Sequence, residues 1–371
     1  MVEVMGIIFA SDNENKLNEL TIHRTTASLP FSGRYRLIDF TLSNLVNSGV
    51  TKIGIITKNN YNSLMDHLRM GRDWDLNRKN SGITLFPPYS LNTSRDVYKG
   101  KVDALYGISH YIRHNKEEYV ILSNSNIAMN IDYDEVYDRH IESGADITML
   151  AYKAQTTTSR RVVISVDKKS RVNDMYISET PDDNLKLVGL NAYLMKKDLL
   201  MDLVEGAYAR GYQDLEKDVL LKKLDILKII CYEVTSYVAI IDDIKSYFNE
   251  SMKLLDQDVR NNLFYASGGT IYTKVKDSVP TIYEDNALVK NSLIADGCQI
   301  DGTIENSILF RGVKVAKGAV IKNSIVMENS SIGSNSMLIY AITDKNVTIR
   351  ENKNMSGYAT YPIVIVKDKT V

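Results

Sequence analysis

Residues 281–371 repeat an apolar position every six residues, and this spacing constrains the fold more than any other feature of the chain. Two series show the interval: Leu309, Val315, Ile321 and Met327, and Val320, Val326, Ile332 and Leu338. The motif Asn-Ser-Leu/Ile also recurs at Asn291, Asn306 and Asn323, with spacings of 15 and 17 residues. Six-residue spacing with intervening Gly, Asn and Ser is typical of a left-handed parallel β-helix, in which three rungs close one triangular coil. We therefore predict this fold for residues 281–371.

Residues 1–250 follow a different pattern, in which short apolar runs alternate with amphipathic ones. Four runs flanked by polar turns predict strands: Val4–Phe9, Lys52–Thr57, Glu118–Ser123 and Asp146–Lys153. Ile38–Asn47 and Asp103–His114 carry apolar residues three and four apart, as crossover helices do. This order predicts an α/β domain with a Rossmann-like, doubly wound sheet, whose ligands bind beyond the carboxyl ends of the strands. Residues 251–280 are expected to be a linker.

The composition bounds the class of protein. The 371 residues are 44% hydrophobic, which is enough for two sizeable cores, and the formal charge of −1 gives no reason to expect nucleic acid or an anionic membrane as a partner. The apolar run Val4–Ala10 lacks a basic segment before it, and no run approaches the ~18 apolar residues of a membrane span. Two distant cysteines, Cys231 and Cys298, suit a reducing cytosol. We expect a soluble, cytoplasmic protein.

The segment Arg24–Gly49, RTTASLPFSGRYRLIDFTLSNLVNSG, carries a family resemblance. It resembles the segment that sugar-nucleotide pyrophosphorylases place after their first glycine-rich loop. Its PF-x-G-[KR]-[YF]-R-[LI]-IDF-x-LSN-x-x-NSG form is that of the ADP-glucose pyrophosphorylases, the glycogen and starch adenylyltransferases. The resemblance implies a nucleotidyltransferase domain followed by a β-helix, and it locates the positions that would bind ATP, Mg²⁺ and glucose-1-phosphate.

The loop that would hold ATP departs from the family pattern. In the family this turn reads A-G-G-x-G-T-R-L-x-x-L-T, whereas residues 10–21 read ASDNENKLNELT, with the flanking leucines and threonine kept. Ser11, Asp12 and Glu14 replace the three glycines, and Lys16 replaces the arginine. Glycines let a backbone approach a phosphate closely, whereas a Cβ obstructs and carboxylates repel the polyphosphate. We expect ATP to bind this loop poorly.

Both metal-binding aspartates of the family are also replaced. Residues 119–133, YVILSNSNIAMNIDY, resemble Y-V-[VI]-I-L-x-G-D-H-I-Y-x-x-D-Y, and this alignment puts Ser125 at the first Mg²⁺ aspartate. The second, in D-V-G-T-x-x-x-Y, aligns with Ile240. Mg²⁺ prefers carboxylate oxygens, which neither side chain supplies. Asp242 and Asp243 lie close by as substitutes, although a shift of two positions would point the side chain differently.

The sugar-phosphate positions are partly retained. Thr180 replaces the lysine of the family's E-K-P, and Thr26 replaces the lysine of R-A-K-P. Asp103 matches Y-x-G-T-A-D-A in residues 98–104, YKGKVDA, while Asp214 and Lys217 match D-F-G-K-D in residues 214–218, DLEKD. These three are candidates for residual ligand binding. The alternative is structural, with aspartates that cap a turn or helix and a lysine on a solvated face.

Arg34 stands where catalytic bacterial members of the family place an effector-contacting lysine, and Arg36 follows it. The resemblance implies a phosphorylated-sugar or phosphate effector near the junction of the two domains. Arginine's planar fork suits such a ligand. Both residues are therefore candidates for effector binding or a subunit interface, and the alternative is a basic strand edge paired with nearby acids.

Over nearly its full length the chain resembles the non-catalytic, D-type regulatory subunits of this family. That resemblance implies a hetero-oligomer, of the tetrameric kind, with a catalytic paralogue, and no tightly bound cofactor or metal. An active adenylyltransferase is the alternative, and only that activity would need Mg²⁺. A hexapeptide acyltransferase is the remote alternative, because such enzymes need a histidine on the coil as general base. All five histidines precede residue 141: His23, His67, His110, His114 and His140.

Overall fold

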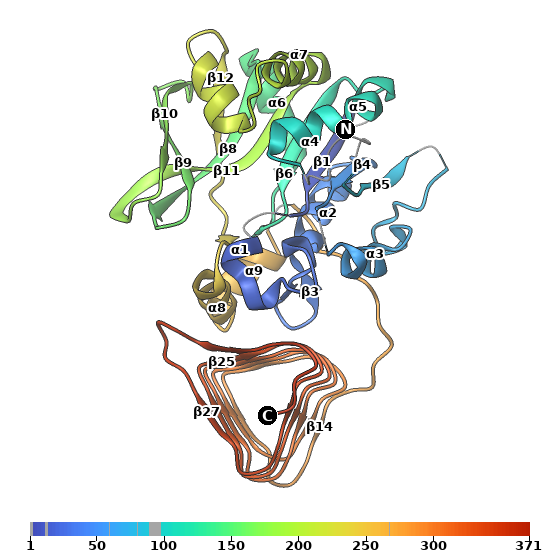
Figure 1. The fold of residues 1–371 in the computed structure, drawn as a ribbon, viewed down its shortest axis with the longest axis vertical. Helices are drawn as coiled ribbons and strands as arrows, with labels where there is room; N and C mark the ends of the chain where they lie inside the picture. Colours follow the sequence, from blue (N-terminus) through green and yellow to red (C-terminus); the bar gives the residue numbers. More distant parts are fainter. Residues whose placement is uncertain (1–2, 12–13, 59, 80, 89–97, 267) are drawn as a thin grey trace.

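The computed structural model describes residues 3–11, 14–58, 60–79, 81–88, 98–266 and 268–371. It consists of an α/β domain and a triangular β-helix that lie end to end (Figure 1). The predicted fold class is confirmed. No helix in the described ranges is long and apolar enough to cross a membrane.

A nine-stranded mixed sheet forms the centre of the α/β domain. Its strands are β1 (Val4–Phe9), β4 (Lys52–Ile56), β5 (Gly82–Phe86), β6 (Tyr119–Asn124), β8 (Ile147–Thr156), β9 (Arg161–Val166), β10 (Val172–Ser178), β11 (Asp182–Lys196) and β12 (Ile229–Glu233). The main order is β10-β9-β11-β6-β1-β4-β5, and β8 pairs with β11 and β12. Strands β6, β1, β4 and β5 run parallel, so their carboxyl ends share one edge. All four strands predicted from the sequence are present.

Helices cover both faces of this sheet, and three others lie at the junction with the β-helix. The helices of the described residues are α1 (Glu14–Leu17), α2 (Leu37–Asn47), α3 (Asn62–Leu68), α4 (Lys101–Gly107), α5 (Ser109–His114), α6 (Tyr133–Ser143), α7 (Lys197–Tyr208), α8 (Ile244–Lys253) and α9 (Gln257–Phe264). Helices α1, α8 and α9 are those at the junction (Figure 1). Helices α4, α5 and α7 pack on one face through residues such as Val102 and Leu200. Helices α2, α3 and α6 pack on the other through residues such as Leu42 and Val136. The single helix predicted over Asp103–His114 is instead two helices, which meet at Ile108.

Two short pairs of strands lie beside the large sheet. Strands β2 (Pro30–Phe31) and β3 (Tyr35–Arg36) form an antiparallel hairpin in the segment that carries the family resemblance. Strands β7 (Ile127–Met129) and β13 (Val238–Ile240) also pair antiparallel, with Ile127 opposite Ile240. This second pair brings two segments together that are more than a hundred residues apart in the sequence.

Three five-stranded parallel sheets form the sides of the β-helix. They are β14 (Ile282–Tyr283), β17 (Gln299–Ile300), β20 (Lys314–Val315), β23 (Ser331–Ile332) and β26 (Thr348–Ile349); β15 (Leu288–Lys290), β18 (Thr303–Glu305), β21 (Val320–Lys322), β24 (Met337–Ile339) and β27 (Asn354–Ser356); and β16 (Leu293–Ile294), β19 (Ile308–Leu309), β22 (Ile325–Val326), β25 (Ala341–Thr343) and β28 (Ile363–Ile365). Leu309, Val315 and Ile321 point into one interior core, as the six-residue interval predicts. Val320 is only half-buried, because its neighbour Ile321 takes the interior position.

The Asn-Ser-Leu/Ile motif forms one corner of successive coils. Asn291, Asn306 and Asn323 have φ values of 44°, 46° and 45°, in the left-handed region that asparagine tolerates better than most residues. Asn291 Nδ2 donates to Asn306 Oδ1 at 2.7 Å. Each motif serine hydroxyl accepts the backbone N–H one coil on, as Ser292 Oγ does from Ser307 at 3.1 Å. The repeated motif is therefore a corner whose polar groups bond along the helix axis.

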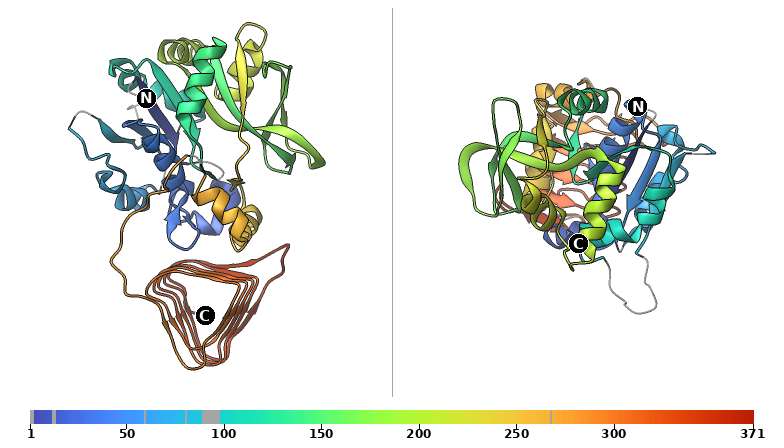
Figure 2. Two further views of the ribbon diagram at one scale, coloured as in Figure 1. Left: turned by 180° about the vertical axis from the view of Figure 1, so that it is seen from behind. Right: turned by 90° about the horizontal axis from the view of Figure 1, so that it is seen from above.

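The segment expected to be a linker is more structured than a plain connection. It holds the end of α8 and all of α9, because apolar residues such as Leu254 and Leu263 are fully buried. An extended segment then runs down one side of the molecule to β14 (Figure 1, Figure 2). One apolar cluster spans the two domains, and it includes Phe31, Phe248 and Met327. The two domains therefore share a continuous core.

Candidate functional site

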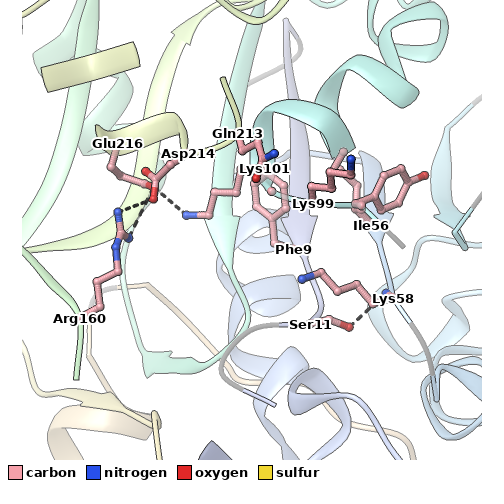
Figure 3. A pocket seen from close by; sticks show the side chains of 13 residues that line it. Phe9, Ser11, Ile56, Lys58, Lys99, Lys101, Arg160, Gln213, Asp214 and Glu216 are labelled. Atoms are coloured by element: carbon pink, nitrogen blue, oxygen red, sulfur yellow. Dashed lines mark hydrogen bonds and ion pairs between the residues drawn. The ribbon is translucent and has the colours of Figure 1, made fainter. Parts of the chain in front are cut away.

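A cavity of about 300 Å³ lies in front of the carboxyl ends of β1 and β4. We call it the cleft cavity, and Figure 3 shows the side chains that line it. Phe9, Ile56 and Ala104 supply apolar walls at the strand ends and on α4. The other lining residues are Ser11, Lys58, Tyr98, Lys99, Gly100, Lys101, Arg160, Gln213, Asp214 and Glu216. The doubly wound topology predicts a ligand site at this edge of the sheet.

A network of ion pairs forms one wall of the cleft cavity (Figure 3). Lys101 Nζ lies 2.7 Å from Glu216 Oε1, which also accepts a hydrogen bond from the Tyr193 hydroxyl at 3.2 Å. Arg160 lies 2.6 Å from Asp214 Oδ2 and 3.9 Å from Glu216 Oε2. Burial alone would raise the pKa of Glu216, but the charge and hydrogen bond of Lys101 and the charge of Arg160 together hold the pKa below its ordinary value. Glu216 is therefore a buried, ionised carboxylate.

The replaced loop borders the cleft cavity. Ser11 Oγ accepts a hydrogen bond from the Lys58 N–H at 3.2 Å, which ties the end of β1 to the end of β4. Asp12 lies outside the described residues. Glu14 begins α1 and is half-buried, whereas Lys16 is exposed on the same short helix. Side chains thus border this edge where the family has a glycine-rich turn.

The two metal-binding positions of the family come together in the structure. Ser125 is fully buried just after β6, and its N–H donates to Phe9 O at 3.1 Å. The hydroxyl Oγ has no hydrogen-bond partner among the described residues. Ile240, at the end of β13, is also buried, and the strand pair β7–β13 holds it near Ser125 in the fold. Neither side chain is a carboxylate, so this pair cannot hold Mg²⁺ as two aspartates would.

The two nearby aspartates have other partners. Asp242 is buried, accepts from Asn126 Nδ2 at 3.1 Å, and forms an ion pair with Arg161 at the start of β9. Asp243 caps α8, because its Oδ1 accepts the Ser246 N–H at 2.7 Å. A guanidinium therefore neutralises one substitute carboxylate, and a helix end uses the other. Within the described ranges, no three His, Cys, Asp or Glu side chains gather as a metal site would need.

The remaining predicted site residues have structural contacts. Asp103 Oδ2 accepts the Lys99 N–H at 3.1 Å, and Asp214 Oδ1 accepts the Lys217 N–H at 2.8 Å, so both cap their own segments. The side chain of Lys217 is exposed and does not line the cleft cavity. Thr180 is exposed, with its carbonyl bonded to Thr156 Oγ1 at 2.8 Å, and Thr26 is fully buried. Asp214 alone among the three retained residues faces the cavity.

Sequence reasoning missed Lys101, Glu216 and Arg160, which carry most of the charge in this wall. A signal for two of them was present. The motif Y-x-G-T-A-D-A has threonine where this chain has Lys101, and D-F-G-K-D has glycine where it has Glu216. Two departures of opposite charge in motifs of one cleft predict an ion pair. Arg160 lies in no motif, so nothing in the sequence pointed to it.

Arg34 and Arg36 point to different surroundings. Arg34 is exposed and lines a cavity of about 480 Å³ at the domain junction, together with Arg260, Tyr265 and Asp296. We call this the junction cavity. Arg36 Nη1 donates to Ser63 O at 2.6 Å and to Ser63 Oγ at 3.1 Å, and burial lowers its pKa. Arg34 thus keeps an accessible guanidinium, while Arg36 binds α3.

A further charged group lies between the domains near Arg36. Glu328 and Lys345, both on the β-helix, form an ion pair at 3.0 Å. Burial lowers the pKa of Lys345 to about 8, although Glu328 opposes this shift. Arg24 and Asp344 form a second pair there, in which Arg24 Nη2 reaches both carboxylate oxygens, at 2.8 and 3.0 Å. At this part of the junction, Glu328 therefore pairs with Lys345 and Asp344 pairs with Arg24.

The fold and the cleft define a nucleotidyltransferase-type domain joined to a hexapeptide β-helix, and comparisons with known proteins agree. The family model described as Nucleotidyl transferase matches residues 5–235, and the model described as GlmU-like, C-terminal hexapeptide matches residues 278–358. The chain belongs to the nucleotidyl transferase family, in the group that contains the glucose-1-phosphate adenylyltransferases and the GlgD proteins.

Several relatives match almost the whole chain. The glycogen biosynthesis protein GlgD of Bacillus subtilis is 35% identical over 365 residues, which cover 98% of this chain and 96% of the relative. GlgD of Geobacillus stearothermophilus is 37% identical over 319 residues, or 86% and 83% of the two chains. The glucose-1-phosphate adenylyltransferase of Fervidobacterium nodosum is 31% identical over 356 residues, or 95% and 85%. The match therefore includes both domains.

Proposed function

We propose that this chain is a non-catalytic regulatory subunit in glycogen biosynthesis, which modulates a catalytic glucose-1-phosphate adenylyltransferase. The observation that carries the proposal is the state of the metal position. Ser125 and Ile240 occupy it, and Arg161 neutralises the nearest substitute carboxylate, Asp242. Phosphoryl transfer depends on cations that neutralise developing charge, and the metal ion supplies the highest positive charge among them.

The other departures support the same proposal. At Ser11 and Glu14 side chains stand where glycines would let the backbone approach a triphosphate. Thr26 and Thr180 lack the positive charges that would contact the sugar phosphate, and Thr180 is exposed. Removing any one part of such a site commonly costs several orders of magnitude in rate, and here several parts have changed together.

The regulatory role rests on partners and effectors that we also propose. The resemblance to GlgD proteins over both domains supports a hetero-oligomer, of the tetrameric kind, with a catalytic paralogue in the cytoplasm. Arg34 in the junction cavity is the proposed contact for a phosphate or phosphorylated-sugar effector, because its guanidinium is exposed beside Arg260. The shared core between the domains gives a physical route by which such binding would bias the partner.

The test is the rate of ADP-glucose formation by the purified chain alone. It is incubated with ATP, glucose-1-phosphate and excess Mg²⁺, and pyrophosphate release is followed against a catalytic adenylyltransferase at equal concentration. We expect no rate above the background without enzyme. A substantial rate, abolished by EDTA, would contradict the proposal.

An active adenylyltransferase is the second candidate, and the cleft cavity is the observation that favours it. The cavity lies at the edge of the sheet where this fold binds ligands, and three lysines and an arginine line it. Such an enzyme would have to hold its metal ion with groups other than Ser125 and Ile240. The same assay separates the two candidates.

A further inference from the structure

The cleft cavity carries an excess of positive charge. Its lining includes four basic side chains, Lys58, Lys99, Lys101 and Arg160, and only two carboxylates, Asp214 and Glu216. The carboxylates both lie on one wall, where Arg160 and Lys101 pair with them. The excess positive charge of the cavity therefore comes from Lys58 and Lys99.

Lys58 supplies that charge on the opposite side. Its side chain extends from the end of β4 into the cavity, toward the wall that holds Lys101 and Arg160 (Figure 3). Lys58 is half-buried, and no carboxylate lies within ion-pair distance of its ammonium among residues 3–11, 14–58, 60–79, 81–88, 98–266 and 268–371. A half-buried ammonium with no such partner is an attractive site for an anion, since its field is less screened than on an open surface.

The opposite wall contains an ion pair between two residues that differ from the family motifs. Lys101 and Glu216 both depart from the family motifs, and they pair with each other at 2.7 Å, with side chains 19% and 2% exposed. Burial removes the hydration of both charges, and their attraction must offset that loss, so a pair of this kind needs good geometry and further hydrogen bonds. Tyr193 supplies one of these to Glu216. Loss of catalysis alone would not select for a matched buried ion pair. Continued binding of an anionic ligand would select for the cation Lys101.

The size and walls of the cavity limit the ligand. A volume of about 300 Å³ is at the small end for ligand pockets, and it suits one compact molecule. Phe9, Ile56 and Tyr98 offer apolar contact to a carbon skeleton, and the cations lie around them. Glycines for a triphosphate and carboxylates for a metal ion are both replaced in this chain. A phosphate monoester needs neither.

We propose that the cleft cavity binds a small phosphate monoester without a metal ion. Lys58 and Lys101 hold its phosphate from opposite sides. The regulatory meaning of this site rests on the proposed function, because an occupied cleft in a non-catalytic subunit reports the ligand to its partner. The binding itself does not depend on that function.

The test is isothermal titration calorimetry on the full chain in EDTA at low salt. Three metal-free probes are used separately: glucose-1-phosphate, AMP and inorganic phosphate. We expect saturable binding of at least one of the two esters, tighter than inorganic phosphate, and weaker binding as NaCl is raised. The ester that binds more tightly identifies the source of the phosphate. Absence of binding by both esters, or binding that requires Mg²⁺, would overturn the proposal.

Two variants and a control assign the binding to this cavity. Lys58→Gln should weaken the ester at least about tenfold, since a hydrogen bond to a charged group is worth ~1.5–3 kcal/mol. Glu216→Gln should tighten binding severalfold, because Lys101 then has no carboxylate to neutralise it. Lys168→Gln, at an exposed lysine in the turn between β9 and β10, is the matched control and should bind as the parent does. Equal affinities of the parent and Lys58→Gln proteins, with folding verified by circular dichroism, would contradict the assignment.

The outcome is separable from that of the activity assay. A chain that makes ADP-glucose overturns the proposed function, whatever binds in EDTA. A chain that is inactive and binds neither ester overturns only the proposal for the cleft cavity.

Discussion

The ion pair between Arg24 and Asp344 joins the two domains, and its removal gives a sharp test of how they are held together. Arg24 is 2% exposed and Asp344 is completely buried. Arg24 Nη2 contacts both carboxylate oxygens, and its Nη1 donates to Leu20 O at 3.1 Å. Asp344 Oδ1 also accepts the Lys345 N–H at 2.7 Å. Arg24→Met keeps most of the side-chain volume but leaves that carboxylate without its cation.

The expected loss is about 3 kcal/mol in the free energy of unfolding. Breaking a buried pair by removing one partner costs ~3–5 kcal/mol. The hydrogen bond from the Lys345 N–H to Asp344 remains in the variant, so we expect a loss at the lower end of this range. Lys153→Met is the matched control, because the ion pair of Lys153 with Glu233 is exposed (60% and 38%) and should be worth less than about 1 kcal/mol.

Urea denaturation with two probes measures both variants. The fluorescence of Trp74, the only tryptophan in the chain, reports the α/β domain, and far-ultraviolet circular dichroism reports both domains. A double-mutant cycle with Asp344→Asn should give a coupling energy of at least ~1 kcal/mol. An equal loss for Arg24→Met and Lys153→Met, or additive effects of the two junction substitutions, would show that this ion pair does not hold the domains together.

Three further outcomes are expected. Ser125→Asp combined with Ile240→Asp should not restore ADP-glucose synthesis, because the replaced loop still lacks its glycines; robust activity of the double variant in the pyrophosphate assay would show that the loop matters little. Arg34→Ala should shift the partner's effector-activation curve and leave complex formation by gel filtration intact, and an unchanged curve removes that role. The pKa of Glu216 is held below its usual 4.5, so its pairing with Lys101 stabilises the fold above that pH and is lost as the pH falls through the lowered pKa. Glu216→Gln should therefore flatten part of the fall in urea midpoint on acidification, and a parallel curve would contradict the ionised assignment.

Much of the fold could be predicted because its signals are local and periodic. Leu309, Val315 and Ile321 repeat at the interval of the β-helix rungs, and each is buried in its interior. The break between α4 and α5 at Ile108 was missed, since apolar spacing continues across it and only the backbone geometry shows the interruption. Periodicity indicates which face is buried, whereas an interruption between two helices of the same face leaves that pattern unchanged.

The candidate site was harder to predict, because its chemistry comes from contacts between distant segments. The replaced positions, such as Ser125, could be identified from motifs. The partner of Asp242 could not, because Arg161 lies about eighty residues earlier and belongs to no motif. The structure brings Arg161 and Asp242 together at one small cavity, and their ion pair determines how this carboxylate is used.

Regulation of a catalytic partner can be measured by titrating this chain into a catalytic glucose-1-phosphate adenylyltransferase from the same cell. ADP-glucose formation is measured at fixed catalytic subunit, with and without effector. We expect no rate for this chain alone, and we expect the rate or effector response of the mixture to change and to saturate at a fixed stoichiometry. A rate that stays unchanged at every ratio, or turnover by this chain alone, would contradict the proposed function.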